Sequence, residues 1–351
     1  MRSLDLVVPG DLETPTGGYE YDRRIANGLR SRGWTVRVHS LAASFPAPTS
    51  AALAHARETF ARIPDDRVVL VDGLALGALP DIASEEAGRL RLVALVHHPL
   101  AAETGLEPAR AEALRRSETR ALRAMRSVIT TSVATARALL EYGVPRERIV
   151  AVEPGTDRAP LARGSGGPAV ELLCVAAIVP RKGHAVLAEA LFHLATRAWR
   201  LTCVGSLARS PETVARLRHR LAELRLADRV RLAGVLDRAA LDACYARADA
   251  FVLATFHEGY GMALAEALAR GLPIVSTRVG AVPDTVPDDA GLLVPPGNVA
   301  ALRDALARVI DDAALRARLA ASARRARERL PTWEEACARI EDALSRDPLH
   351  R

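Results

Sequence analysis

Two glutamates, Glu258 and Glu266, flank a segment that could bind an anion carrying hydroxyl groups. The glycines at 259 and 261 between them let the backbone approach a ligand closely. A helix predicted to begin in this segment would offer unpaired amides and a partial positive charge to a diphosphate. We expect Glu266, inside that helix, to accept hydrogen bonds from ribose hydroxyls, and Glu258, in the loop, to reach sugar hydroxyls.

The spacing of the two glutamates also fits a purely structural alternative. Glu258 could cap the helix, and Glu266 could form an ion pair with Arg270, four residues further on. Arg181 and Lys182 favour the binding site, because they follow an earlier predicted strand of the same sheet. Of the 48 lysine and arginine residues, only Lys182 is a lysine. Two cations at this place would offset the charge on a departing nucleoside diphosphate.

The elements that position these residues are predicted from short apolar runs that alternate with helical periodicity. This pattern is typical of βα units and mainly parallel sheets. Strands are predicted in the first half at 4–8, 35–39, 67–71, 92–96, 127–130 and 149–152, and in the second half at 172–178, 200–204, 229–232, 250–253, 273–276 and 291–294. Ligands of such sheets bind beyond the carboxyl ends of the strands, so the loops after strands are the candidate sites.

The same pattern predicts two domains, which also suits the length of 351 residues. Residues 1–157 form the first domain and residues 169–330 the second. The segment 158–168, rich in glycine and proline, is predicted to be a linker. A final helix, about 333–351, begins near Trp333.

The first half adds two weaker candidates at the ends of strands. Gly17 and Gly18 form a turn into a helix, and their amides could reach a phosphate. His97 and His98 follow the strand 92–96. Adjacent histidines point in different directions, so we expect at most one to contact a ligand, and a structural role for either stays open.

Composition limits the function classes. The formal net charge of +6 favours anionic partners. The four cysteines have no zinc-like spacing and are interpreted as reduced core residues of a cytosolic protein. The absence of an Asp-x-Asp pair gives no indication of a divalent metal. No apolar run approaches the roughly 20 residues that span a bilayer.

Motifs along nearly the whole chain resemble those of the retaining glycosyltransferases of family 4. They comprise Gly17-Gly18, Val96-His97, Thr131-Ser132, residues 152–157, Arg181-Lys182-Gly183, Val204-Gly205, residues 258–266, residues 271–275 and Gly280. The resemblance implies an α/β fold of the GT-B type, with two Rossmann-like, doubly wound parallel-sheet domains facing across a cleft. It also implies that the final helix packs back on the first domain.

The resemblance further implies roles for individual residues. Arg181 and Lys182 would bind the donor diphosphate, Glu266 the ribose, and Glu258 the transferred sugar, with His97 near the anomeric centre. His97, Glu258, Arg181 and Lys182 are therefore the catalytic candidates. The remaining donor-binding candidates are Gly17, Gly18, Gly259, Tyr260, Gly261 and Met262, with Gly205 and Val235 near the base.

The expected activity is transfer of a hexose from a GDP- or UDP-sugar to a hydroxyl acceptor with retention of configuration. The acceptor would be a small molecule, a lipid-linked molecule or a glycan. Because no carboxylate nucleophile is evident, we expect attack on the front face of the sugar. No cofactor and no metal are expected, and the enzyme is expected to be cytoplasmic, with peripheral contact to the inner membrane face left open.

Three alternatives remain at this stage. A sugar-nucleotide epimerase or hydrolase of the same fold would use the same donor site. A dinucleotide-dependent oxidoreductase lacks its glycine fingerprint here. A binding protein for anionic membrane could use the arginines at 110, 115, 116, 120, 123 and 126, although such a run is more often a solvated helix face. Nucleic acid is not expected as a partner, because aromatic residues are not interleaved with the basic ones.

Overall fold

The structure, a computed structural model, describes residues 2–345 and divides into two compact units. The first unit contains the chain up to Gly155 together with the residues from Pro331 onward, and the second unit contains Thr156–Leu330. The chain therefore leaves the first unit once and returns to it near its end.

The first unit is built on a parallel sheet of six strands in the order β2-β1-β3-β4-β5-β6. These strands are β1 (Ser3–Pro9), β2 (Thr35–Leu41), β3 (Val68–Asp72), β4 (Arg91–Val96), β5 (Ser127–Thr130) and β6 (Ile149–Ala151). The central strands are nearly continuous apolar runs, as expected for a parallel sheet that is covered on both faces.

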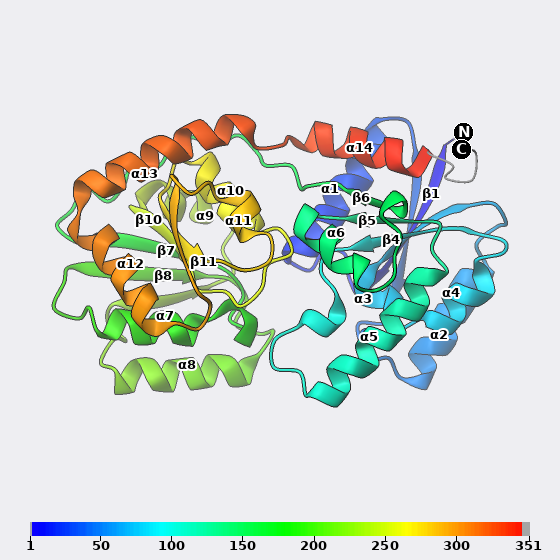
Figure 1. Cartoon of the computed structure of the whole chain (residues 1–351), viewed down its shortest axis with the longest axis horizontal. Helices are drawn as coiled ribbons and strands as arrows, with labels where there is room; N and C mark the ends of the chain where they lie inside the picture. The colour runs from blue at the N-terminus through cyan, green and yellow to red at the C-terminus, as the bar shows by residue number, and fades with distance from the viewer. Residues whose placement is uncertain (1, 346–351) are drawn as a thin grey trace. The chain divides into compact units, whose positions relative to one another are not determined.

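Helices cover both faces of this sheet (Figure 1). They are α1 (Gly17–Ser31), α2 (Ser50–Ala61), α3 (Gly73–Leu76), α4 (Pro80–Glu86), α5 (Pro108–Arg123), α6 (Val133–Leu140) and α14 (Trp333–Ser345), with short 3₁₀ turns η1 (Leu100–Ala102) and η2 (Arg146–Arg148). Successive strand residues point to opposite faces. On β1, for example, Leu6 and Val8 pack under α1 and α14, whereas Val7 packs under the helices α2 to α6.

Helix α14 brings the end of the chain onto the first unit. A capping box starts it: the Thr332 hydroxyl accepts a hydrogen bond from the Glu335 amide (3.2 Å), and the Glu335 carboxylate accepts one from the Thr332 amide (2.8 Å). The apolar face of α14 then packs on α1 through Cys337, Ile340 and Leu344. Residues 346–351, which we predicted as the end of this helix, lie outside the described residues.

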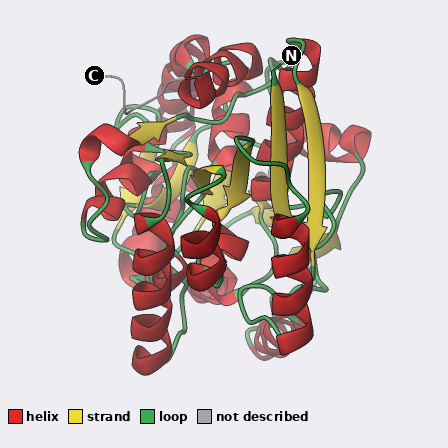
Figure 2. Ribbon diagram, turned by 90° about the vertical axis from the view of Figure 1, so that its right-hand side faces the viewer, coloured by secondary structure: helices red, strands yellow, loops and turns green. Residues whose placement is uncertain are grey.

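The second unit repeats the architecture with the strand order β12-β11-β10-β7-β8-β9, again all parallel. The strands are β7 (Val170–Val175), β8 (Trp199–Val204), β9 (Val230–Gly234), β10 (Ala250–Leu253), β11 (Ile274–Thr277) and β12 (Gly291–Val294). The helices are α7 (His184–Phe192), α8 (Pro211–Glu223), α9 (Arg238–Arg247), α10 (Met262–Ala269), α11 (Val282–Thr285), α12 (Val299–Asp311) and α13 (Ala313–Ala326), with η3 (Pro180–Lys182) and η4 (Arg327–Arg329). Figure 2 shows helices around the strands from a second direction.

All the predicted strands are present among the described residues, and the largest difference is at β7, which ends at Val175 instead of Ile178. The segment 158–168 also differs from our prediction of a linker, since it belongs to the second unit. It forms no helix or strand, yet the Ala162 amide donates to the Arg270 carbonyl and the Arg163 amide to the Ala246 carbonyl, both at 2.9 Å. Backbone hydrogen bonds therefore hold this glycine- and proline-containing segment in place.

Candidate active site

The turn after β7 carries Arg181 and Lys182 and is fixed by the glycine that follows them. Gly183 has a left-handed backbone (φ 67°), and a β-carbon at this position would lie 1.9 Å from the carbonyl oxygen of Ala254. Only glycine suits both conditions. The turn can therefore press against the end of β10, the neighbouring strand.

Hydrogen bonds join this turn to the loop after β10. The Phe256 amide and the Thr255 hydroxyl both donate to the Arg181 carbonyl, at 2.7 and 3.1 Å. In return, the Arg181 guanidinium donates to the His257 carbonyl (2.8 Å). The two loops are thus one structure at the carboxyl edge of the sheet, where ligands of open α/β sheets bind.

Lys182 and Glu258 form an ion pair in this joined loop. The Lys182 ammonium lies 2.6 Å from Glu258 Oε1, and the two side chains are 17% and 7% exposed. Burial by itself would raise the pKa of Glu258, but Lys182 and Arg181 outweigh it and lower the pKa, so the group is a carboxylate. The backbone of Glu258 is held as well, because its carbonyl accepts the Ala281 amide (3.0 Å) and leaves no space for a β-carbon on Gly280.

Helix α10 starts next to this ion pair without a side-chain cap. Its N-cap, Gly261, has a left-handed backbone (φ 94°). Within residues 2–345, the amides of Met262 and Ala263 donate to no partner. Unpaired amides at a helix start attract anions. Because no side chain caps the helix, our alternative that Glu258 is a cap is wrong.

Glu266 lies inside α10, and its carboxylate accepts a hydrogen bond from the Tyr245 hydroxyl (3.1 Å). Burial raises the pKa of Glu266, although Arg270 and Tyr245 oppose this. The Arg270 guanidinium forms its ion pair with Asp242 at 2.5 Å and donates to the backbone carbonyl of Glu266 at 3.0 Å. The alternative of a Glu266–Arg270 ion pair is therefore wrong, and one oxygen of Glu266 is left for a ligand.

Gly205 and Val235 follow β8 and β9, directly after the ends of these strands. The Gly205 amide donates to the Gly234 carbonyl (2.8 Å), and Val235 is 56% exposed. Since the sheet order is β10-β7-β8-β9, the candidate residues of the second unit follow four adjacent strands at one edge. The structure thus pairs Lys182 with Glu258, joins Arg181 to the same loop through the His257 carbonyl, and places Gly205 and Val235 further along that edge.

In the first unit, Gly17 and Gly18 are the first residues of α1. The Thr16 hydroxyl caps this helix by accepting from the Tyr19 amide (3.2 Å). No described residue accepts a hydrogen bond from the amide of Gly17 or Gly18. A β-carbon on Gly18 would touch the ring of His97 at 3.4 Å, so the glycine lies flat against that histidine.

His97 and His98 separate as expected for adjacent residues. His98 lies 3.6 Å from the partly exposed Glu103. His97 Nε2 lies 3.1 Å from Asp22 Oδ1 and 3.4 Å from Asp72 Oδ2, and both carboxylates are buried. Burial by itself lowers the pKa of His97, but Asp22 and Asp72 outweigh it and raise the pKa to about 10. Burial, together with Asp72, raises the pKa of Asp22 to about 6 although His97 opposes it.

Asp22 and Asp72 were not predicted as functional candidates from the sequence. Asp72 is a single acidic residue in an apolar context, Asp22 is one of several charged residues on a predicted helix, and the two lie far apart along the chain. A second cluster was not predicted either: ligand atoms of Cys174, His184 and Cys203 lie within 4.8 Å of one another. Cys174 and Cys203 are register partners on β7 and β8, a contact that their spacing in the sequence does not reveal. These are the two groups among residues 2–345 whose donor atoms lie close enough to share a metal ion.

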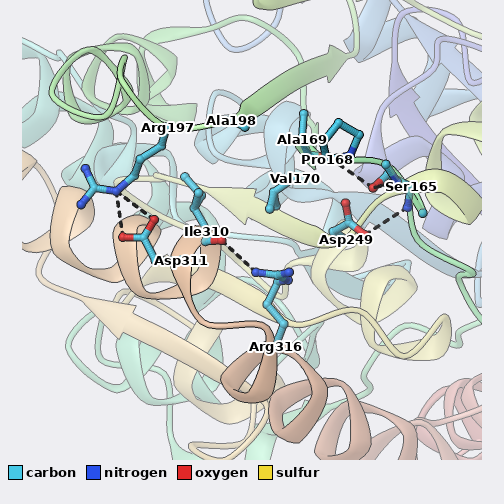
Figure 3. A pocket seen from close by; sticks show the side chains of 12 residues that line it. Ser165, Pro168, Ala169, Val170, Arg197, Ala198, Asp249, Ile310, Asp311 and Arg316 are labelled. Atoms are coloured by element: carbon cyan, nitrogen blue, oxygen red, sulfur yellow. Dashed lines mark hydrogen bonds and ion pairs between the residues drawn. The ribbon is translucent and has the colours of Figure 1, made fainter.

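A surface hollow of about 390 Å³ lies elsewhere in the second unit (Figure 3). Its lining includes Val170 and Ala198, at the amino ends of β7 and β8, so it lies at the opposite edge of the sheet from Lys182. Its charged groups have partners within the unit: Arg197 pairs with Asp311 (2.8 Å), Asp249 accepts from the amide of Ser165 (3.0 Å), and the Arg316 guanidinium donates to the Val309 and Ile310 carbonyls (2.7 and 2.9 Å). The hollow also lacks the joined loops and the uncapped helix start found at the Lys182 edge.

The arginine-rich segment forms α5 and the residues just after it. Arg116 pairs with Glu112 (3.2 Å), Arg120 pairs with Asp81 (2.6 Å), and Arg115 lies over the Tyr142 ring (4.8 Å). Contacts inside the unit thus occupy part of this positive charge. Within residues 2–345, each helix is too short or too polar to span a bilayer.

Two Rossmann-like units, each built on a parallel sheet of six strands covered by helices, are the architecture of the GT-B class of fold. Two family models match the chain: Glycosyltransferase Family 4 over residues 17–159 and Glycosyl transferases group 1 over residues 163–326. The chain is also 30% identical over 313 residues to the MMP alpha-(1->4)-mannosyltransferase of Mycolicibacterium hassiacum, a match that covers 84% of this chain and 74% of that protein. The chain belongs to glycosyltransferase family 4, and the relatives that it matches are named as transferase enzymes.

Other relatives match over a shorter length. The D-inositol 3-phosphate glycosyltransferase of Xylanimonas cellulosilytica is 32% identical over 227 residues, which is 60% of this chain and 54% of that protein. The chain thus spans about half the length of the relatives of this kind that it matches. Similar solved structures include sucrose-phosphate synthase (tll1590) from Thermosynechococcus elongatus (TM-score 0.82, 21% identity, 97% of this chain, 98% of that one) and Anabaena Alr3699/HepE in complex with UDP-glucose (0.79, 20%, 98%, 100%). At this identity the structures show the shared fold.

Proposed function

We propose that this glycosyltransferase takes its sugar from a nucleoside diphosphate donor, UDP- or GDP-linked, and transfers it with retention to a hydroxyl acceptor. The observation that carries the proposal is the Lys182–Glu258 ion pair, with Arg181 bonded to the neighbouring His257 carbonyl, beside the uncapped start of α10. A diphosphate needs cations and unpaired amides, and a sugar needs a carboxylate that accepts hydroxyl donors. This edge of the sheet offers all of them within one joined loop.

The charges at the site suit a leaving diphosphate. Glu258 holds the Lys182 ammonium in place, and the Arg181 carbonyl and guanidinium tie that residue to residues 255–257. Fixed donors stabilise charge as it develops without having to reorganise during the reaction. Arg181 and Lys182 would thus stabilise the diphosphate, and Glu258 would orient a hydroxyl of the transferred sugar. Glu266 would bind the ribose through the oxygen that Tyr245 leaves open.

The named relatives support the donor and acceptor classes. One similar structure holds UDP-glucose, and the matched sequences include a mannosyltransferase and D-inositol 3-phosphate glycosyltransferases. A hexose donor and an acceptor hydroxyl on a sugar or polyol agree with these names. Base recognition would involve the backbone at Gly205 and Val235.

For the reaction, we propose front-face attack without an enzyme nucleophile. The bond between the anomeric carbon and the diphosphate oxygen breaks, and the acceptor oxygen bonds to the same face of that carbon. The acceptor proton passes to the leaving phosphate oxygen, so the atoms and charges balance. Arg181 and Lys182 provide the positive charge that a metal ion would otherwise supply, and no metal or cofactor is part of the proposal.

A donor panel tests this function. The full-length protein is incubated with UDP- and GDP-hexoses and candidate polyol and sugar-phosphate acceptors, with and without EDTA. Release of nucleoside diphosphate and the anomeric configuration of the product are measured, the latter by NMR. We expect one donor to be used, with retention and with no loss in EDTA. An inverted product would contradict the mechanism, and donor turnover that does not depend on any acceptor would favour a hydrolase.

Arg181→Ala tests the site in the same assay. Its control is Arg318→Ala, because Arg318 is an exposed residue of α13. Loss of a fixed donor to the developing charge lowers kcat by about 10²- to 10³-fold, and we expect that loss for Arg181→Ala alone. Equal activity of the two variants would show that the chemistry lies elsewhere.

A further inference from the structure

The group formed by Asp22, Asp72 and His97 lies at the carboxyl edge of the first sheet. Asp72 ends β3, His97 directly follows β4, and Asp22 comes from α1. β3 and β4 are neighbours in the sheet, so their ends lie side by side. Three elements therefore converge on one imidazole ring.

Both carboxylates face the same ring nitrogen. Asp22 Oδ1 and Asp72 Oδ2 lie 3.1 and 3.4 Å from His97 Nε2, and the two side chains are 0% and 3% exposed. A lone pair on this nitrogen would face two oxygen acceptors, so Nε2 must carry the hydrogen. The carboxylates are held in this place: Asp72 Oδ1 caps α3 by accepting the Leu74 amide (2.8 Å), and Asp22 lies within the body of α1.

The remaining contacts of the ring define which edge is open. Gly18 covers the Cδ2–Nε2 edge, so that a β-carbon added to it would lie 3.4 Å from Cδ2, and the Tyr21 ring meets the imidazole edge-on at 5.5 Å. The hydroxyls of Thr131 and Thr135 donate to the backbone carbonyl of His97. Nδ1 has no hydrogen bond within residues 2–345, and the side chain is 22% exposed.

The charge of the group decides whether Nδ1 is an acceptor or a donor. In a histidine dyad, one carboxylate orients the ring and leaves the second nitrogen as a base. Here the ring faces two carboxylates whose oxygens lie within 4.8 Å of one another, and like charges this close in a buried site persist only when one takes up a proton or a cation lies against both. The pKa of Asp22 is raised only to about 6, so at pH 8 both groups are ionised and a cation is required. The titratable groups facing the ring are Asp22 and Tyr21 from α1 and Asp72 from the end of β3, and none of them is basic. His97 is the cation, in agreement with a pKa raised to about 10.

We propose that His97 works as a permanently protonated imidazolium whose Nδ1–H is a fixed hydrogen-bond donor to a ligand oxygen, with Asp22 and Asp72 as the positioning residues that keep it charged and oriented. His97 is then not the general base of the reaction. The assignment of the oxygen to a sugar or phosphate group rests on the proposed function, whereas the charge and orientation of the ring do not.

Nitrogen NMR of protein labelled in its histidine side chains tests the proposal directly. The His97 signals are assigned by their loss in His97→Gln, and the spectrum is followed from pH 6 to pH 11. We expect both His97 nitrogens to be protonated at pH 8 and the ring to titrate above about pH 8.5. The pKa of His97 should fall by at least about one pH unit in each of the single variants Asp22→Asn and Asp72→Asn, because each substitution removes one negative charge.

Asp81→Asn is the control, since this exposed acid pairs with Arg120 and should leave the His97 titration unchanged. If a variant fails to fold, the titration of His97 in the unsubstituted protein still tests the proposal by itself. A His97 ring that titrates near 6.5, or holds a single proton at pH 8, would overturn the proposal. So would selective broadening of its signals by substoichiometric Mn²⁺, which would make the group a metal site. Because the readout is a protonation state, it is independent of whether any donor sugar is turned over.

A kinetic readout then connects the ring to the reaction. With the donor and acceptor identified by the panel, a donor Nδ1–H predicts that kcat of the unsubstituted enzyme stays flat between pH 6 and 8.5. In Asp22→Asn, kcat should fall at the upper end of this range as the ring loses its proton. A rise of kcat with an apparent pKa near 6.5, assigned to His97, would make it a general base and contradict the proposal.

Discussion

At the scale of single residues, Lys182 and Glu258 combine two tasks, since they form a buried ion pair and are also the proposed donor contacts. Removing one partner of a buried pair leaves the other charge without compensation. We expect Lys182→Met and Glu258→Gln each to lower the free energy of unfolding by about 3 kcal/mol, and the double variant to lose less than the sum. Urea unfolding of the four proteins measures this coupling.

The exposed pair Arg325–Asp289 on the same unit is the control, and its coupling should stay below about 1 kcal/mol. Additive losses for Lys182 and Glu258 would show that the pair is not a unit in solution. The sequence predicted that both residues belong to one site, because each follows a strand. It did not reveal their direct contact, which depends on Gly183 bringing the two loops together.

At the scale of elements, Glu118 on α5 fixes the loop that follows the two histidines. Its carboxylate accepts the amides of Leu100 (2.8 Å) and Ala101 (3.3 Å), and burial raises its pKa to about 7 in spite of these hydrogen bonds. The folded state thus holds this proton more tightly than the unfolded state, in which the pKa is about 4.5. The resulting stabilisation is complete below about pH 4.5 and is lost as the pH rises through 7.

We therefore expect the free energy of unfolding to fall between pH 4.5 and 7.5 by up to about 3 kcal/mol more in the unsubstituted protein than in Glu118→Gln. Urea unfolding across this range measures the difference. Glu112→Gln, an exposed residue of the same helix, should leave the slope unchanged. Parallel curves for the unsubstituted protein and Glu118→Gln would show that Glu118 titrates normally.

The elements themselves were the most predictable part of the fold, because buried parallel strands are apolar on both faces and stand out in the sequence. The segment 158–168 was not predictable in the same way. Glycine and proline indicate a break in regular structure, but they do not show that the Ala162 and Arg163 amides find carbonyl partners in the second unit. Likewise, Asp22 lies on α1, which follows β1, and Asp72 ends β3. The two meet at His97 only because the sheet order places β1, β3 and β4 side by side.

At the scale of the whole molecule, α14 ties the end of the chain to its beginning. A β-carbon on Gly28 would lie 2.1 Å from the Cys337 sulfur, so α1 and α14 pack as closely as a glycine allows. We expect Gly28→Ala to lower the free energy of unfolding of the first unit by about 1–3 kcal/mol through overpacking. Thermal unfolding measures the loss, and Cys337→Ala in the same protein should recover part of it.

Gly88→Ala is the control for this substitution, because nothing lies within 4 Å of its added β-carbon. A Gly28→Ala protein as stable as Gly88→Ala would show that α14 does not pack closely on α1 in solution. The division into units follows from the repeated strand pattern. The close fit of α14 depends on a glycine and a cysteine at opposite ends of the chain, and no local pattern connects them.

The central claim is that the joined loops after β7 and β10 bind a nucleoside diphosphate. Isothermal titration of UDP and of GDP into the unsubstituted protein, Arg181→Ala and the control Arg318→Ala tests it most directly. We predict that one of the two nucleotides binds, that Arg318→Ala binds it equally well, and that Arg181→Ala binds it at least about 10-fold more weakly, since a charge-assisted phosphate contact contributes about 1.5–3 kcal/mol. Binding of neither nucleotide, or equal binding by Arg181→Ala, would contradict the account.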